Sequence, residues 1–209
     1  MAEGMTENAA GADEMKPVEA LIVVDAQTAF MSGEEAVPAA AELLVQLKSL
    51  VARAREAGAL IVHLQNDGAP GTVDEPGTPG WELYLPVETG PRETVIRKEE
   101  DDGFEGTNLG DLLVGEGVRA LAVCGVMSEM CVLATARAAL ERDYRVVLPH
   151  DAHATYDIPA GPGSDGVPAA TASRVAEWAL GDEIEIVANA SSVPFARRAA
   201  SDVSATSRG

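Results

Sequence analysis

Three residues whose side chains serve nucleophilic catalysis follow apolar segments of the chain. Asp25 comes directly after the run ALIVV, Lys98 directly after ETVIR, and Cys131 a short distance after ALAVC. A thiolate is a nucleophile, a carboxylate can take the proton of a thiol, and a lysine can stabilise the negative charge that develops. Taken singly, each has a simpler interpretation: Asp25 as a cap, Lys98 as a surface lysine beside acidic residues, and Cys131 as a small buried hydrophobe.

The order of apolar and helical segments decides whether these residues can meet. Short apolar runs typical of buried parallel strands alternate with stretches of helical periodicity. We expect strands at residues 20–24, 59–64, 93–97, 120–124, 145–148 and 183–187, and helices at residues 38–57, 109–114, 128–141 and 168–180. This order predicts an α/β three-layer sandwich of the Rossmann-like type, in which helices flank a six-stranded, mainly parallel sheet.

Ligands of such sheets bind at the carboxyl ends of the strands, near a switch in strand order. Asp25, Lys98 and the segment 125–131 all follow expected strands, so the fold would place them at one edge of the sheet. Cys131 also falls near the start of an expected helix, whose positive end and free N–H groups favour a thiolate and can hold an oxyanion. The convergence of three residue types needed for one reaction predicts a cysteine hydrolase.

The composition is that of one acidic globular domain. The 209 residues are 46% hydrophobic and carry a net charge of -19, so we expect no nucleic acid partner and no membrane association. This charge would attract a cationic small-molecule substrate, although acidic surfaces are common and have no specific meaning by themselves. We expect a disordered leader at residues 1–17, one domain at residues 18–195 and a flexible tail at residues 196–209.

The two cysteines, Cys124 and Cys131, are too few for a typical secreted disulfide scaffold. Cys124 lies inside an expected strand, where a buried and inert thiol is the favoured interpretation. The start of the chain has no apolar segment of the signal-peptide type, and no apolar run approaches the ~18 residues of a membrane helix. We therefore expect two free thiols and a cytoplasmic protein.

Three ordered blocks of sequence resemble the isochorismatase-like cysteine hydrolase superfamily over nearly all of the expected domain. They are DAQTAF with Asp25, RKEEDDGFEGTNL with Lys98, and GVMSEMCVLATARAAL with Cys131. The resemblance implies that these three residues are a catalytic triad that cleaves a C–N amide bond through a thioester, without a cofactor. It also implies a cis peptide between Val126 and Met127, which helps to direct the backbone N–H groups of Met127 and Cys131 at the oxyanion.

Candidates for the substrate pocket come from these blocks, from a long loop, and from the segment LPHDAHATYD that contains the end of the fifth expected strand. They are Gln27, Phe30, Trp81, Phe104, Val126, His153 and Tyr156. Trp81 belongs to a segment rich in Pro and Gly, residues 66–92. This segment is either a lid over the pocket or a solvated loop with one packed aromatic side chain.

Departures from the family's patterns narrow the expected reaction. Isochorismatases that cleave a vinyl ether lack the cysteine, so Cys131 argues against that reaction. Nicotinamidases hold a metal after the second strand with an aspartate and two histidines. The segment HLQNDGAP offers Asp67 alone, so we expect no metal there and interpret His63 as a core or supporting histidine. The segments SEMC and PHDAHATYD resemble the corresponding segments of the streptothricin hydrolases of actinobacteria. This resemblance implies the lactam of a cationic antibiotic as substrate.

The sequence leaves other functions open. A nicotinamidase, an N-carbamoyl-type amidase or an enzyme for another small amide would use the same residues. A non-catalytic ligand-binding domain on the same sheet is an alternative of another class, whereas a dinucleotide-binding dehydrogenase is disfavoured because no G-x-G-x-x-G follows the first strand. Members of the superfamily usually form dimers or tetramers, so the resemblance implies a homodimer or a homotetramer.

Overall fold

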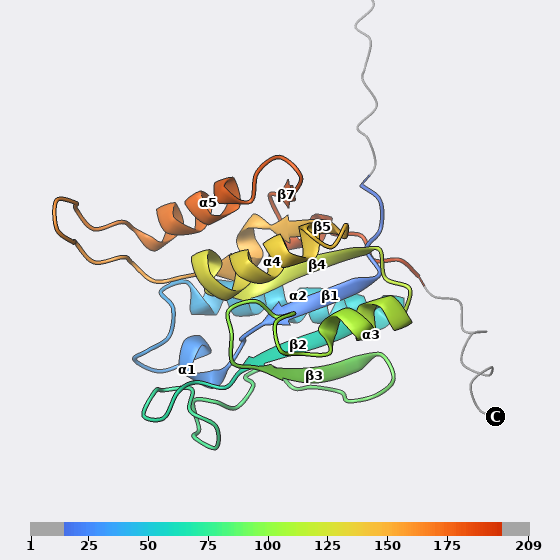
Figure 1. Cartoon of the computed structure of the whole chain (residues 1–209), viewed down its shortest axis with the longest axis horizontal. Coiled ribbons are helices and arrows are strands. Elements are labelled where there is room, and N and C mark those ends of the chain that lie inside the picture. Colours follow the sequence, from blue (N-terminus) through green and yellow to red (C-terminus); the bar gives the residue numbers. More distant parts are fainter. Residues whose placement is uncertain (1–14, 198–209) are drawn as a thin grey trace, which may run out of the picture.

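The computed structural model describes residues 15–197, which form an α/β fold around a parallel sheet (Figure 1). The strands are β1 (Ala20–Val24), β2 (Leu60–Asn66), β3 (Glu93–Lys98), β4 (Ala120–Val126), β5 (Arg145–Pro149), β6 (His153–Ala154) and β7 (Glu185–Val187). Six of them lie in the order β3-β2-β1-β4-β5-β7, and the short β6 pairs with β4. All of these pairs are parallel, so the predicted fold class is confirmed.

Helices cover both faces of this sheet. They are α1 (Thr28–Met31), α2 (Ala40–Ala57), α3 (Leu109–Gly115), α4 (Leu133–Leu140) and α5 (Ala169–Ala179), with shorter turns η1 (Ser128–Val132), η2 (His150–Ala152) and η3 (Ala190–Ser192). In Figure 1, α3 and α4 lie in front of the sheet and α2 lies behind it. Successive strand residues point to opposite faces: Leu21 and Val23 pack in the core with α2, whereas Ile22 and Val24 pack in the core with α3 and α4.

Both ends of the described chain contact the domain. Met15 packs against the core beside α2, and the amide of Ala196 donates a hydrogen bond to the carbonyl of Val18 at 2.9 Å. The last residues of the predicted leader and the first of the predicted tail therefore touch the folded body. The rest of both segments lies outside the described residues. Between residues 15 and 197, no helix has the length and apolar character needed to cross a membrane.

Several local predictions differ from the structure. The predicted helix 128–141 is two elements, η1 and α4, because Met130 has the non-helical angles φ −113° and ψ −107°. The last strand begins at Glu185 and not at Glu183. The elements α1 and β6 were not predicted, because four and two residues are too few to show a period.

A buried ionic cluster joins β3 to β2 and α2. Glu93, the first residue of β3, accepts hydrogen bonds from Arg55 at 2.7 and 2.6 Å and contacts His63 at 2.9 Å. His63 is fully buried in β2, as expected for a core histidine. Burial raises the pKa of Glu93, but the hydrogen bonds from Arg55 and His63 outweigh burial and lower this pKa to about 2.

Glu93→Gln should lower the free energy of unfolding by about 3 kcal/mol at neutral pH, because Arg55 and His63 lose a buried carboxylate. The ionised carboxylate is the stabilising form. Its contribution is therefore complete above the ordinary pKa of 4.5 and is lost as the pH falls towards about 2. Urea denaturation of both proteins between about pH 7 and pH 3 measures the difference, which should shrink as the pH falls.

Glu88→Gln is the matched control for this prediction. Glu88 pairs with the same Arg55 at 3.1 Å, but its side chain is 73% exposed, so its loss should cost less than about 1 kcal/mol. Equal losses in the two variants would contradict the importance of the buried cluster.

Candidate active site

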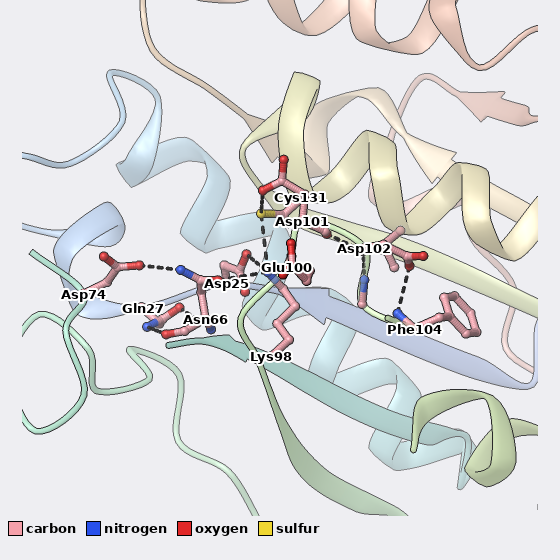
Figure 2. A network of polar contacts seen from close by, with 12 residues as sticks. Asp25, Gln27, Asn66, Asp74, Lys98, Glu100, Asp101, Asp102, Phe104 and Cys131 are labelled. Atoms are coloured by element: carbon pink, nitrogen blue, oxygen red, sulfur yellow. Dashed lines mark hydrogen bonds and ion pairs between the residues drawn. The ribbon is translucent and has the colours of Figure 1, made fainter. Parts of the chain in front are cut away.

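Asp25, Lys98 and Cys131 meet at the carboxyl ends of β1, β3 and β4, as the strand-end rule predicts (Figure 2). Lys98 lies between the other two. Its Nζ is 2.9 Å from Asp25 Oδ2 and donates to Cys131 Sγ at 3.4 Å. All three residues are buried. A carboxylate, an ammonium and a thiol that touch away from bulk water can move a proton from sulfur to oxygen and stabilise the charges that result.

Asp25 has the environment of a general base. Burial raises the pKa of its carboxyl, and the Lys98 ammonium lowers this pKa only in part, so the pKa lies above its usual value. This direction follows from its place at the end of a buried apolar strand. Oδ2 pairs with Lys98, whereas Oδ1 is buried with no hydrogen-bond partner within residues 15–197. The backbone enters the left-handed region here, with φ 48°, a conformation that aspartate adopts more readily than most residues.

The surroundings of the Cys131 thiol raise its pKa. Burial raises its pKa, the Asp25 carboxylate raises it further, and Lys98 lowers it without reversing the shift. The thiol therefore needs a base to take its proton, a role that a carboxylate such as Asp25 can fill. Burial also lowers the pKa of Lys98, but the attraction of the Asp25 carboxylate and the hydrogen bonds to Asp25 and Cys131 raise this pKa overall.

Three residues that no sequence pattern marked as candidates complete the surroundings of Lys98 and Cys131. Lys98 Nζ donates to Asn66 Oδ1 at 3.3 Å and to the carbonyl of Glu100 at 3.1 Å. The Cys131 thiol lies 3.4 Å from Asp101 Oδ1. Asn66 ends β2, so the strand-end rule could have found it. Glu100 and Asp101 stand in a run of acidic residues that gave no such signal.

The turn between β4 and α4 contains Met127 and Cys131, whose backbone N–H groups the resemblance implied as oxyanion donors. The peptide between Val126 and Met127 is cis, as expected. The carbonyl of Met127 accepts hydrogen bonds from the amides of Met130 and Val132 at 3.1 and 3.2 Å, the two residues on either side of Cys131. The turn therefore wraps around the nucleophile, and the role of the Met127 and Cys131 amides as oxyanion donors stays a prediction.

Gly125 allows β4 to enter this turn. Its φ is 122°, and a Cβ at this position would lie 2.0 Å from the carbonyl oxygen of Val24 in β1. Gly125→Ala should therefore lower the free energy of unfolding by about 3 kcal/mol or more, because the strained φ and the overlap with a backbone atom must both be relieved. Thermal and urea unfolding followed by circular dichroism measure the loss.

Gly117→Ala separates these two contributions. Gly117 also has a positive φ of 69°, but nothing lies within 4 Å of an added Cβ. This variant should lose only about 1 kcal/mol, the cost of the left-handed backbone for a residue with a side chain. A loss at Gly125 no larger than that at Gly117 would argue against a close approach of β1.

The apolar pocket candidates lie in the cores. Phe30 packs in the core beside α2, and Val126 is fully buried at the end of β4. Phe104 stacks on Tyr144 with 6.2 Å between the ring centroids, and Arg142 lies 4.6 Å from its centroid. Phe104 belongs to the same core as Cys131, whereas Phe30 and Val126 belong to the core on the other face of the sheet. Contact of the three side chains with a substrate stays a prediction.

Two polar candidates, Gln27 and Trp81, hold the loop after β2 in place. The side chain of Gln27 is fully buried; it donates to the carbonyl of Asn66 and accepts from its amide, each at 2.9 Å, and donates to the carbonyl of Trp81 at 3.0 Å. Trp81 Nε1 donates to Asp67 at 2.8 Å, and Arg97 lies 5.1 Å from the indole ring. The contacts of Gln27 and of one packed aromatic side chain, Trp81, thus hold the loop against the sheet edge beside Lys98.

The remaining candidates, His153 and Tyr156, contact other segments. Tyr156 donates its hydroxyl hydrogen to the carbonyl of Glu35. His153 is buried, with Nδ1 2.8 Å from the Ser128 hydroxyl and Nε2 3.1 Å from a Glu177 oxygen. His153 therefore contacts Ser128, the first residue of η1, which is the turn that carries the nucleophile. Direct contact of either residue with a substrate stays a prediction.

Two places in the described chain carry side chains that a metal could use. Asp67, after β2, pairs with Arg97 at 2.6 Å, so a cation already neutralises its carboxylate. The expectation of no metal there stays a prediction. The other place is the group of His150, His153 and Glu177, whose ligand atoms all lie within 4.8 Å of one another.

Known proteins resemble this chain in sequence and fold. Residues 19–161 match the family model described as the isochorismatase domain. Two streptothricin hydrolases from Streptomyces noursei are 70% identical over 183 residues and 72% identical over 179 residues, or 87% and 85% of this chain. The chain spans 73% and 65% of the lengths of these relatives. An isochorismatase structure from Pseudomonas putida KT2440 matches with a TM-score of 0.76 at 29% identity, covering 86% of this chain and 93% of that one.

The matched region begins just before β1 and ends after β6. It contains the three blocks that suggested the family, and with them Asp25, Lys98 and Cys131. The match extends over more than half of the chain, and the described fold agrees with that of the solved relative. The chain therefore belongs to the isochorismatase family of hydrolases.

Proposed function

We propose that this chain is a cysteine amidohydrolase that opens the lactam amide of a streptothricin-type compound. The observation that carries the proposal is the 70% identity to a streptothricin hydrolase over 87% of the chain. The contacts among Asp25, Lys98 and Cys131 support the reaction type, because they supply a base, a cation and a nucleophile in one buried group.

The reaction begins with a proton transfer inside the triad. Asp25 takes the proton of the Cys131 thiol, while Lys98, 3.4 Å from the sulfur, stabilises the thiolate. The sulfur attacks the carbonyl carbon of the amide, and the backbone amides of Met127 and Cys131 hold the oxyanion. As the C–N bond breaks, Asp25 gives the proton to the leaving nitrogen, and a thioester remains on Cys131.

Water completes the cycle. Asp25, again ionised, takes a proton from the water that attacks the thioester, and the departing sulfur recovers that proton. The carbonyl and nitrogen of a lactam belong to one ring, so the amine released in the first half stays attached to the acyl group. The product is therefore the substrate plus one water, with no fragment lost.

A cavity of about 750 Å³ beside Lys98 supports a cationic substrate. Its lining includes two basic residues, Arg97 and Lys98, and four acidic ones, Asp67, Glu99, Glu100 and Glu105. Arg97 is paired with Asp67, and Lys98 with Asp25, so the three glutamates leave the cavity negative. Of the triad, Lys98 alone lines this cavity, so a positive group drawn there by this charge would lie beside Lys98.

Hydrolysis of a panel of amides tests the proposal. The panel contains a streptothricin lactam, nicotinamide, an N-carbamoyl amino acid and ureidoacrylate, with products identified by mass spectrometry. The lactam should gain the mass of one water, with kcat/KM at least about 100-fold above that of the other amides. Turnover of nicotinamide or of the N-carbamoyl compound alone would overturn the lactam as substrate and leave the amidohydrolase chemistry in place.

A further inference from the structure

We infer that His150, His153 and Glu177 form a binding site for a divalent transition metal ion, with Zn²⁺ as its fitting probe. Both imidazoles converge on one oxygen of Glu177: His150 through Nδ1, and His153 through Nε2 at 3.1 Å. The three ligand atoms all lie within 4.8 Å of one another. Small side-chain movements would bring all three to the bond lengths of about 2.0–2.2 Å that Zn²⁺ requires.

The chain supplies these ligands from two separate elements. His150 and His153 stand three residues apart across the turn η2, which joins β5 to β6, and their rings meet edge to face with 6.3 Å between the centroids. Glu177 comes from α5. A bound ion would therefore tie α5 to the carboxyl end of the sheet.

The ring of His153 is oriented as a metal ligand must be. Its Nδ1 contacts the Ser128 hydroxyl at 2.8 Å, which turns Nε2 towards Glu177. Histidines that bind metals almost always have such a partner on the second ring nitrogen. The other oxygen of Glu177 is held in turn, because Arg174 lies 3.5 Å from it.

Burial and charge also favour an ion at this point. The side chains of His153 and Glu177 are 0% and 2% exposed, whereas that of His150 is 51% exposed, which gives an ion a path from solvent. The carboxylate of Glu177 contacts both imidazoles and supplies the negative charge of the site. Two imidazoles and one carboxylate suit Zn²⁺ and its neighbours, whereas Ca²⁺ and Mg²⁺ prefer oxygen ligands. Three protein ligands leave one position for water.

The site adjoins η1, the turn that carries the nucleophile. His153 pairs with Gly125 of β4, and its partner Ser128 is the first residue of η1. A bound ion would hold α5, β6 and η1 together. Its role is to support this turn, and it does not take part in the cleavage of the amide.

Zinc titration of the untagged full chain, after treatment with a chelator, tests the inference. Calorimetry should show one saturable site per chain, and zinc should raise the Tm. Since the loss of even an outer partner of a ligand costs about 10–100-fold in affinity, His150→Gln should weaken binding by at least about 100-fold. Glu177→Gln should act in the same way. Asp182→Asn, which removes an exposed charge just after α5, is the charge-matched control and should bind zinc as the unaltered chain does.

Cobalt identifies the ligands. Co²⁺ in this site should absorb in the visible range and show no thiolate charge-transfer band. A thiolate band that disappears in Cys131→Ser would place the ion on the catalytic cysteine and overturn the inference. Equal zinc affinity in the unaltered chain and His150→Gln, or no saturable binding to the unaltered chain, would overturn it as well.

Discussion

Cys131→Ser should lower kcat/KM for the lactam by about 10⁶-fold, the loss seen when a nucleophile that acts as a unit with its base is removed. A hydroxyl gives up its proton much less readily than a thiol, so Asp25 cannot generate a comparable nucleophile. The fold should survive, because serine has nearly the size of cysteine and can accept a hydrogen bond from Lys98, which lies 3.4 Å from the sulfur. Steady-state kinetics and circular dichroism measure the two effects separately.

Cys124 provides the matched control. It is fully buried in β4, its thiol lies 3.6 Å from the carbonyl oxygen of Ile22, and burial raises its pKa. Cys124→Ala should therefore leave kcat/KM nearly unchanged at a cost of about 1 kcal/mol in stability. Iodoacetamide should label Cys131 in the unaltered chain much faster than Cys124. Loss of activity in Cys124→Ala alone would contradict the assignment of the nucleophile.

The thioester gives an independent measurement of the same prediction. Acid quenching during turnover should trap a covalent adduct whose mass equals that of the entire lactam, because the amine stays attached to the acyl group. Peptide mapping should place the adduct on Cys131. A linear amide would leave a smaller adduct, since its amine departs before deacylation. An adduct smaller than the substrate would therefore show that the cleaved bond is not in the ring.

The triad could be predicted because its position depends on strand ends, which the sequence marks clearly. Asp25 directly follows the buried strand β1, Lys98 is the last residue of β3, and parallel strands bring such positions to one edge of the sheet. The register of β1 with β2 and of β2 with β3 then sets Asp25 and Lys98 at neighbouring levels. The role of Cys131 required further evidence, because its segment alone also fitted a buried structural cysteine. The family's ordered blocks of sequence decided between the two roles.

The balance of effects on the thiol pKa could not be predicted from the sequence, because it depends on how deeply the folded chain buries the site. A helix start and a lysine lower a thiol pKa, but burial and Asp25 raise the pKa of the Cys131 thiol by more. The break at Met130 also replaces the expected regular helix start with a π-helical turn. Phe104 shows the same limit: its stacking on Tyr144 joins segments far apart in the sequence, which no local pattern reveals.

Asp25→Asn should lower kcat/KM by about 10⁴-fold, because it removes the base and keeps the size of the side chain. The amide cannot take the thiol proton, and burial still raises the pKa of the Cys131 thiol. Lys98 also loses the partner 2.9 Å from its Nζ, so a buried ammonium is left unpaired and the variant should be less stable by about 3 kcal/mol. Activity is therefore compared at a temperature at which circular dichroism shows both proteins to be folded.

The pH profile tests whether Asp25 acts as the base. A base works only when it is ionised, and burial raises the pKa of Asp25 above its ordinary 3.8. The kcat/KM value should therefore fall with decreasing pH at a higher pH than it would for a surface carboxyl, and this acid limb should be absent in Asp25→Asn. On the alkaline side, the pKa of Lys98 lies above its ordinary 10.5. Deprotonation of Lys98 should therefore not reduce activity below that value.

Asp101 is the competing acceptor for the thiol proton, since its Oδ1 lies 3.4 Å from Cys131 Sγ. Asp101 is exposed, whereas Asp25 is buried against Lys98. A proton on Asp101 would exchange with solvent, but a proton on Asp25 stays beside the reacting atoms and can return to the leaving nitrogen. Asp101→Asn should therefore cost less than about tenfold in kcat/KM and keep the acid limb. The opposite pattern, with the acid limb lost in Asp101→Asn and kept in Asp25→Asn, would transfer the role of base to Asp101.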